Sequence, residues 1–218
     1  MGRSTLQPIQ PQVDLRLARR WLDFCVQEHW RRCQGSKKRV IDLMVIDCEN
    51  RVIVPLPARG NYVTLSYVWG NHPEQERSSL QESSLPVPLP QTIEDAITVT
   101  KGLGYNYLWV DKYCIDQRKE DFHTKLRQMD VIYENSVLTI IAAAGSHSSY
   151  GLAGISKIRK SCSTQRLKSL PFLVADELRK SVWASRAWTF QEGLLSTRRL
   201  IFTEKQMYFE CQGLYCFE

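Results

Sequence analysis

The strongest constraint on the fold is a short apolar and aromatic run, residues 107–110, that changes abruptly to a carboxylate, a lysine and a thiol over residues 111–114. A short apolar run that follows a glycine-containing turn is typical of a buried strand. In an α/β sheet, ligands bind beside the carboxyl ends of such strands, and Asp111 falls at that end. A purely structural interpretation stays open, in which Asp111 caps the next helix and Cys114 is a small buried apolar side chain.

Two other runs of β-forming residues predict neighbours for this strand. Residues 62–70 are rich in β-branched and aromatic side chains and end in glycine. Residues 137–144 are apolar, with one threonine, and suit a strand that is buried on both faces. The sequence therefore predicts three core strands.

Helical patterns separate these runs. A helix is predicted from Pro90 to Gly102, with Thr92 and Asp95 in the spacing of a capping box. A second helix is predicted over residues 120–133. Alternating strands and helices favour an α/β fold with a parallel sheet and right-handed crossovers.

Flanking elements complete the predicted architecture. Residues 14–30 have the periodicity of an amphipathic helix, and residues 40–46 and 52–56 suggest a hairpin whose second strand, with two prolines, lies at an edge. We expect a flexible N-terminus and one domain over residues 14–218. Its parts are an N-terminal helix and hairpin (14–60), core β-α units (61–145), a basic insertion (146–182), and a helix with a C-terminal hairpin (183–218).

The net charge of +6 and the pI of about 9.0 raise the question of a nucleic-acid partner. The basic residues are scattered, and neither zinc-finger spacing nor an RNA-binding signature is present, so we do not expect nucleic acid. Basic surroundings also attract an anionic dinucleotide. The seven cysteines show no spacing typical of a disulfide framework, and the sequence contains no signal peptide or membrane span. We therefore expect a cytoplasmic protein that does not bind a membrane.

Several cysteines raise the question of a metal site. Cys25, His29 and Cys33 are spaced four apart, so that they share a helix face, and Cys211 and Cys216 are further candidates. This spacing matches no compact zinc motif, and from the sequence alone we expect no metal.

Three blocks of sequence stand out together, residues 65–70, 108–117 and 186–192. The order of these blocks and their amino-acid sequences resemble the fungal heterokaryon-incompatibility (HET) domain, and the resemblance extends from about residue 20 to residue 218. The resemblance implies a role in non-self recognition and programmed cell death. It also implies a fold similar to the Toll/interleukin receptor (TIR) domain, a flavodoxin-like parallel sheet flanked by helices.

Some TIR domains hydrolyse NAD with one glutamate, so the resemblance suggests an NAD+ glycohydrolase that uses NAD as substrate and needs no cofactor. Glu192 is the expected catalytic carboxylate, four residues after Trp188 and hence on the same helix face. The expected substrate-binding residues follow the strands or precede this glutamate: Ser66, Tyr67, Trp69, Asp111, Lys112, Cys114, Arg186 and Trp188. Lys112 departs from the family pattern, which usually has a small residue there.

Other functions remain open from the sequence. The main alternative is a non-catalytic module of the same pathway that acts by self-association, and we expect a homo-oligomer in either case. A thiol hydrolase would use Cys114 as nucleophile with His123 or His147 as base. A nicotinamide-dependent oxidoreductase is disfavoured because no G-x-G-x-x-G motif follows a candidate strand.

Overall fold

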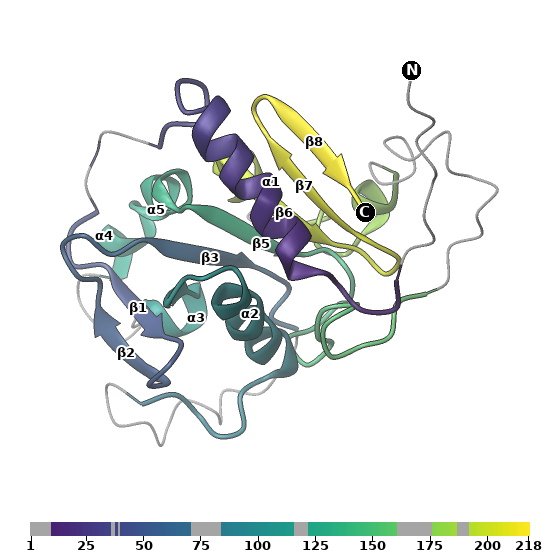
Figure 1. Ribbon diagram of the computed structural model, residues 1–218. Coiled ribbons are helices and arrows are strands. Elements are labelled where there is room, and N and C mark those ends of the chain that lie inside the picture. Colours follow the sequence, from purple (N-terminus) through teal and green to yellow (C-terminus); the bar gives the residue numbers. More distant parts are fainter. Residues whose placement is uncertain are drawn as a thin grey trace.

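The structure is a computed structural model that describes residues 10–35, 38, 40–70, 84–115, 122–160, 176–186 and 192–218 (Figure 1). Over these residues it has one sheet of eight strands, in the order β2-β1-β4-β3-β5-β6-β7-β8. The strands are β1 (Met44–Asp47), β2 (Val52–Pro55), β3 (Tyr62–Ser66), β4 (Tyr107–Trp109), β5 (Leu138–Ala142), β6 (Arg198–Phe202), β7 (Met207–Cys211) and β8 (Leu214–Phe217). The helices are α1 (Leu15–Glu28), α2 (Gln91–Gly102), α3 (Asp111–Cys114), α4 (Phe122–Leu126) and α5 (Met129–Asn135).

The centre of the sheet consists of four parallel strands, β4, β3, β5 and β6. Every residue of β3 and β5 is buried, as the apolar runs predict for strands covered on both faces. Counted in chain order, the four strands lie in the spatial order 2-1-3-4, so the order reverses between β3 and β5. The predicted α/β fold with a parallel sheet is confirmed, and the reversal marks where such sheets bind ligands.

Antiparallel strands flank the parallel centre on both sides. The predicted hairpin of β1 and β2 is confirmed, and β2 lies at the edge of the sheet, as its prolines predict. On the other side, β6 and β7 form the predicted C-terminal hairpin. Strand β8 was not predicted, and it pairs with β7 through residues 214–217.

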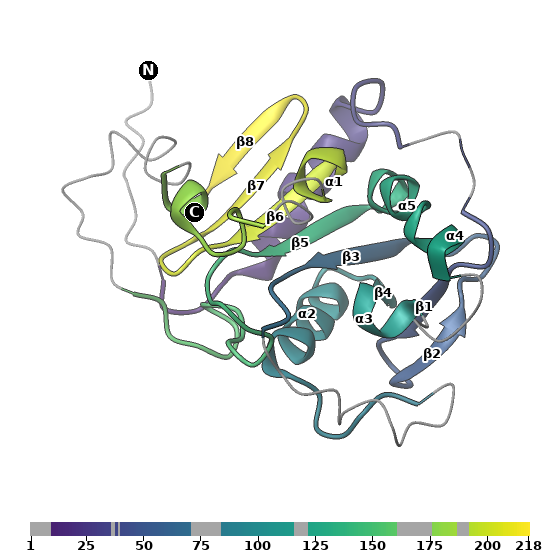
Figure 2. The same ribbon diagram turned by 180° about the vertical axis from the view of Figure 1, so that it is seen from behind.

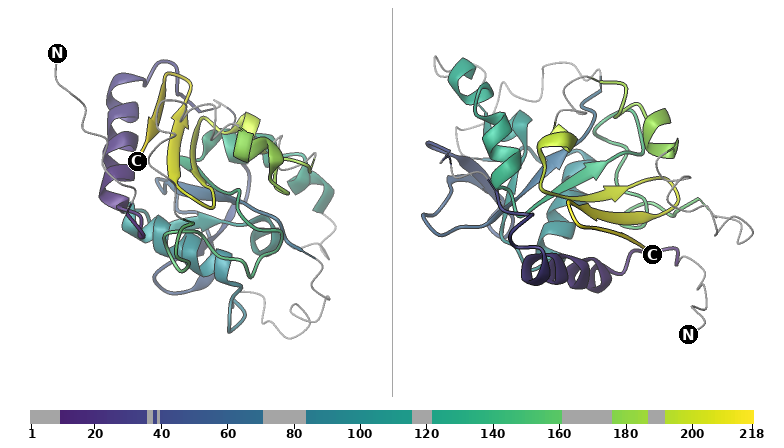
Figure 3. Two further views of the ribbon diagram at one scale, coloured as in Figure 1. Left: turned by 90° about the vertical axis from the view of Figure 1, so that its right-hand side faces the viewer. Right: turned by 90° about the horizontal axis from the view of Figure 1, so that it is seen from above.

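Helices cover both faces of the sheet. Helices α1 and α2 lie on one face, and α4 and α5 lie on the opposite one (Figures 2 and 3). Helix α1 confirms the predicted N-terminal helix. The side chain of Asp14 accepts a hydrogen bond from the backbone N–H of Arg16 (3.0 Å) at its start. None of the helices in the described ranges is both long and apolar enough to cross a membrane.

The single helix predicted over residues 120–133 is wrong, because α4 and α5 are separate helices in the described part of this segment. The chain turns at Gln128, whose side-chain oxygen accepts a hydrogen bond from the backbone N–H of Ile41 (3.0 Å). Only α5 buries apolar residues, among them Ile132 and Tyr133. The apolar residues keep a helical spacing across this turn, so the sequence pattern does not reveal that the helix is interrupted.

The predicted capping box at the start of α2 is also wrong, since no side chain caps this helix. Thr92 and Asp95 instead bind the loop after β5. The Thr92 hydroxyl accepts from the N–H of Gly151 (3.0 Å), and the buried Asp95 carboxylate accepts from the N–H of Leu152 (2.6 Å). A tertiary contact therefore replaces the local one that the spacing predicts.

Candidate functional site

Glu192 lies in a helical stretch that is described over residues 192–195, and its side chain is buried, with the residue 7% exposed. Ser66, the last residue of the central strand β3, donates a hydrogen bond from its hydroxyl to Glu192 Oε2 (2.6 Å). Because β3 lies in the middle of the sheet, this hydroxyl is also fully buried. Sequence segments 126 residues apart thus meet at the carboxyl end of a parallel strand.

Trp183 fixes the direction of this hydrogen bond. Its indole Nε1–H donates to Ser66 Oγ (2.7 Å), so the hydroxyl proton of Ser66 is left to point at Glu192. Gly193 allows this arrangement, because a Cβ at that position would lie 2.8 Å from the Trp183 ring. No sequence pattern assigned Trp183 to the site, although this residue lies only nine positions before Glu192.

Tyr133, on α5, brings a second hydroxyl beside Glu192, where it lowers the pKa of that carboxyl group, and this hydroxyl also donates to the backbone carbonyl of Leu65 (3.4 Å). The ring is fully buried against Trp109, with the ring centroids 5.4 Å apart. Burial and the nearby charge of Glu192 raise the pKa of Tyr133 well above its usual value, so this hydroxyl stays a hydrogen-bond donor. The sequence indicated only that Tyr133 lies on the apolar face of a helix.

The electrostatic environment makes Glu192 an unusual carboxyl group. Burial, and next the negative charge of Asp111, raise the pKa of Glu192 to about 8. The hydroxyl groups of Ser66 and Tyr133 and the charge of Arg186 act in the opposite direction. A carboxyl group held between ionised and neutral forms near neutral pH is typical of functional sites.

A cavity of about 410 Å³ opens onto Glu192. Among the described residues, its lining comes from α4, α5, the turn between them and the helical stretch of Glu192, and includes His123, Leu126, Arg127, Met129, Asp130, Tyr133, Glu192 and Leu195. The volume lies in the range of small-molecule sites. The cavity thus combines apolar walls, basic side chains and one buried reactive group.

Comparison with known proteins identifies the family. The family described as heterokaryon incompatibility protein (HET) matches residues 62–192. The chain belongs to the HET family. The matched segment starts at the first residue of β3 and ends at Glu192, so it contains both partners of the Ser66–Glu192 hydrogen bond. Membership implies a role in heterokaryon incompatibility and cell death. No curated protein and no solved structure matches the chain.

Asp111 and Trp69 form a second pair at the same end of the HET sheet. Trp69 Nε1–H lies 3.2 Å from each carboxylate oxygen of Asp111. The backbone N–H of Lys112 donates to Asp111 Oδ1 (2.7 Å). Asp111 is close enough for its charge to raise the pKa of Glu192. The structure therefore brings this predicted pair to the predicted carboxylate.

The other predicted residues differ in their relation to Glu192. Tyr67 is buried, and its phenol lies close enough to Tyr133 to contribute, after burial and the charge of Glu192, to the raised pKa of Tyr133. Arg186 is half-buried, and its positive charge lowers the pKa of Glu192. Trp188 lies outside the described residues.

Cys114 is placed away from this cluster. The thiol accepts a hydrogen bond from the backbone N–H of Val110 (3.3 Å), and its helix α3 packs against β1. Burial raises the pKa of Cys114 to about 12, so the thiol is protonated and unreactive at neutral pH. His123 instead lines the cavity of Glu192, and His147 packs against the ring of Tyr150 (centroids 6.2 Å apart). The structure gives no support to a thiol hydrolase.

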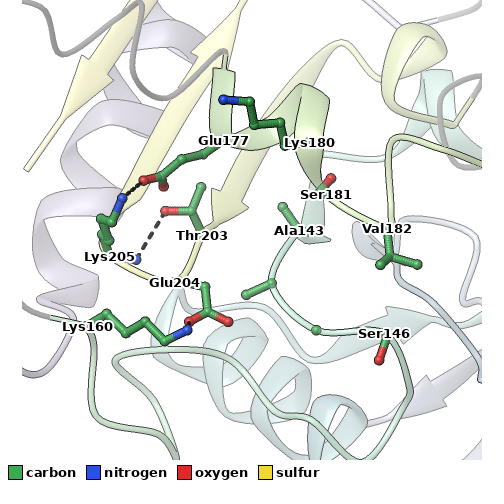
Figure 4. A pocket seen from close by; sticks show the side chains of 12 residues that line it. Ala143, Ser146, Lys160, Glu177, Lys180, Ser181, Val182, Thr203, Glu204 and Lys205 are labelled. Atoms are coloured by element: carbon green, nitrogen blue, oxygen red, sulfur yellow. Dashed lines mark hydrogen bonds and ion pairs between the residues drawn. The ribbon is translucent and has the colours of Figure 1, made fainter.

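A second cavity, of about 500 Å³, lies beyond the carboxyl ends of β5 and β6 (Figure 4). Four of its charged side chains form ion pairs within the lining, Lys160 with Glu204 and Lys205 with Glu177, and Lys180 pairs with Asp176. All of these side chains are at least one-quarter exposed. The described lining of this cavity therefore offers no buried reactive group comparable to Glu192.

Proposed function

We propose that this HET domain is an NAD+ glycohydrolase in which Glu192 is the catalytic carboxylate. The observation that carries the proposal is the buried Glu192 side chain at the wall of a 410 Å³ cavity, oriented by Ser66 at the carboxyl end of β3. Some TIR domains, whose fold the HET family resembles, cleave NAD with a single glutamate. The comparison suggests the substrate, and the site geometry supplies the reactive group.

The reaction breaks the bond between C1′ of the ribose and the nicotinamide nitrogen. The bonding electrons go to nicotinamide, which leaves uncharged and so needs no strong general acid. The ribose carbon takes on oxocarbenium character, which the ionised Glu192 stabilises or attacks. Water then adds to C1′, and the products are nicotinamide, ADP-ribose and one proton.

Substrate charge favours the reactive form of Glu192. In the free domain, burial and Asp111 raise the pKa of Glu192 to about 8. The nicotinamide ring of NAD+ carries a positive charge, which lowers the pKa of a carboxyl group beside it. Binding of the oxidised dinucleotide therefore ionises the group that cleaves it.

Neighbouring residues take distinct roles in the proposal. Ser66 is fully buried and hydrogen-bonded to Trp183 and Glu192, so it is a positioning residue for the carboxylate rather than a ligand of the ribose. Asp111 and Lys112 are half-buried just beyond the carboxyl end of β4, and in this proposal they bind ribose hydroxyls and phosphate. Arg127 in the cavity wall and Arg186 supply positive charge for the pyrophosphate.

The test compares the parent domain with Glu192→Gln and Glu134→Gln, each incubated with NAD+ at high protein concentration. Glu134 is a matched control, because it lies on α5 but is not part of the cavity wall. Nicotinamide release is measured by chromatography, and circular dichroism checks folding. We expect release by the parent and by Glu134→Gln, and a loss of at least about 100-fold in Glu192→Gln.

Two results would contradict the proposal. One is undiminished release by a folded Glu192→Gln variant, which would move the chemistry to another group. The other is no release from the folded parent at any concentration. That second result would favour the self-associating module, and sedimentation of the same samples would then report its oligomeric state.

A further inference from the structure

We propose that Cys25, His29, Cys33 and Cys211 bind one structural zinc ion. Their ligand atoms all lie within 4.8 Å of one another. The sequence offers the first three residues at a spacing of four, with Cys211 and Cys216 as further candidates, but this spacing matches no compact zinc motif. The structure selects Cys211 as the fourth ligand, because β7 carries Cys211 to the end of α1.

Local structure explains why the first three ligands converge. Cys25 is in the last turn of α1, and His29 ends the helix with its backbone N–H bonded to the carbonyl of Cys25 (2.9 Å). The N–H of Cys33 in turn bonds to the carbonyl of His29 (2.8 Å). Residues at these positions lie above one another on one side of the chain.

The fourth ligand comes from the far end of the sequence. Cys211 is the last residue of β7, and the turn into β8 lies beside the C-terminal end of α1 (Figure 1). Gly213 in this turn permits the close approach, because a Cβ there would lie 3.1 Å from two atoms of the His29 ring. The sequence separation of Cys33 and Cys211 hides the set from any compact motif.

The distances suit a tetrahedral zinc site. Cys211 Sγ lies 3.5 Å from His29 Nδ1. Zinc bonds of about 2.3 Å to sulfur and about 2.1 Å to nitrogen place such a pair about 3.6 Å apart, and two sulfurs about 3.8 Å apart. Three cysteines with one histidine are a ligand set of structural zinc sites, which fill all four positions with protein groups.

The surroundings suit bound thiolates. All three cysteines are buried, and two of the sulfurs already accept N–H groups: Cys25 from Arg198 Nε (3.2 Å) and Cys211 from the backbone of Gly213 (3.4 Å). Three thiolates and Zn²⁺ leave one net negative charge, which the Arg198 guanidinium compensates. Donors to the ligand atoms and a compensating charge are the outer-shell support that metal sites require.

The first test is metal analysis of the 218-residue chain, purified without chelator. We expect about one zinc per chain by mass spectrometry of the metals. After removal of zinc under reducing conditions, titration with cobalt should give the intense visible bands of a tetrahedral, thiolate-bound ion, saturating at about one equivalent. These readouts need no variant and no enzymatic activity.

Variants then assign the ligands. Cys211→Ser should lower the zinc content at least about tenfold, whereas His29→Cys should retain zinc and shift the cobalt bands toward those of a four-cysteine site. Cys216→Ser is the matched control, since this neighbouring thiol in β8 is outside the cluster, and it should bind like the parent.

Three results would overturn the proposal. The first is a folded, reduced parent that binds neither zinc nor cobalt at micromolar concentration. The second is a disulfide within the cluster in protein purified under reducing conditions, detected by intact mass. The third is equal loss of metal from Cys216→Ser and Cys211→Ser.

Discussion

The hydroxyl groups of Ser66 and Tyr133 favour the ionised form of Glu192, yet burial and the charge of Asp111 raise the pKa of Glu192 to about 8. If the ionised form is the catalyst, kcat/KM for nicotinamide release should rise with pH, with a midpoint near about pH 8. Asp111→Asn should move the midpoint to lower pH, because it removes the like charge. The measurement is the rate at low NAD+ from about pH 6 to about pH 10. A profile that falls over this range would instead assign Glu192 the role of a general acid.

The same carboxyl group affects stability. Because folding raises the pKa of Glu192 from 4.5 to about 8, the folded state holds the proton more tightly than the unfolded state does. The free energy of unfolding therefore loses a contribution as pH rises between these two values. Glu192→Gln should be more stable than the parent at pH 9, on the order of 2 kcal/mol, with a much smaller difference near pH 5. Urea unfolding at both pH values checks this, and a difference independent of pH would contradict it.

At the scale of elements, the short helical stretch of residues 192–195 packs directly against the Trp183 ring. A Cβ at position 193 would lie 2.8 Å from that ring, which is itself buried. Gly193→Ala should therefore displace Trp183 or Glu192, with a loss of about 10- to 100-fold in nicotinamide release and about 1–3 kcal/mol in stability. Leu194→Ala is the control, because Leu194 is 68% exposed and its loss should change neither measurement. Parent-like activity in Gly193→Ala would show that Trp183 does not position the site.

The elements predicted from the sequence are those whose pattern is local. The apolar runs of β3 and β5 and the periodicity of α1 indicated their type and burial correctly. Strand β8 escaped prediction, because its half-buried residues at the end of the chain have no clear alternation. The capping box was wrong for a related reason: Asp95 binds a loop far along the chain, and no local rule includes that partner.

The candidate site was predictable only in part. A strand ending in Ser66 and another followed by Asp111 indicated which edge of the sheet to examine. The hydroxyl of Tyr133 and the indole of Trp183 were not predicted, since both residues also fit an apolar core. Their roles depend on which hydrogen-bonding atom faces the Ser66–Glu192 pair, and only tertiary structure determines that.

At the scale of the whole molecule, a buried ion pair joins distant parts of the chain. Arg159 Nη2 lies 2.5 Å from Glu218 Oε2, and their side chains are only 3% and 9% exposed. Arg159 also donates to the carbonyl of Gln10 (3.2 Å), and Glu218 accepts from the N–H of Met207 (3.0 Å). Part of the predicted basic insertion is thus buried and holds together the two ends of the described chain.

Loss of the Arg159–Glu218 ion pair should lower the free energy of unfolding. Glu218→Gln leaves the buried guanidinium of Arg159 without its counter-charge, and we expect a loss of about 3 kcal/mol in the free energy of unfolding. Lys160→Met is the control, because it breaks the exposed pair with Glu204 and should cost less than about 1 kcal/mol. Chemical unfolding of both variants measures these losses. Equally small losses in the free energy of unfolding would show that the buried ion pair contributes little to stability.

The strand order divides the HET domain into two consecutive pieces of chain. All strands up to β5 lie on one side of the β5–β6 pairing, and all later strands lie on the other. Glu192 belongs to the later piece and Ser66 to the earlier one, and Cys211 is separated from Cys25 in the same way. Neither piece alone contains a complete site. If the chain were divided between residues 160 and 176, neither fragment alone would form either site. Reassembly of the two fragments through the β5–β6 pairing would restore both the carboxylate site and the proposed zinc site.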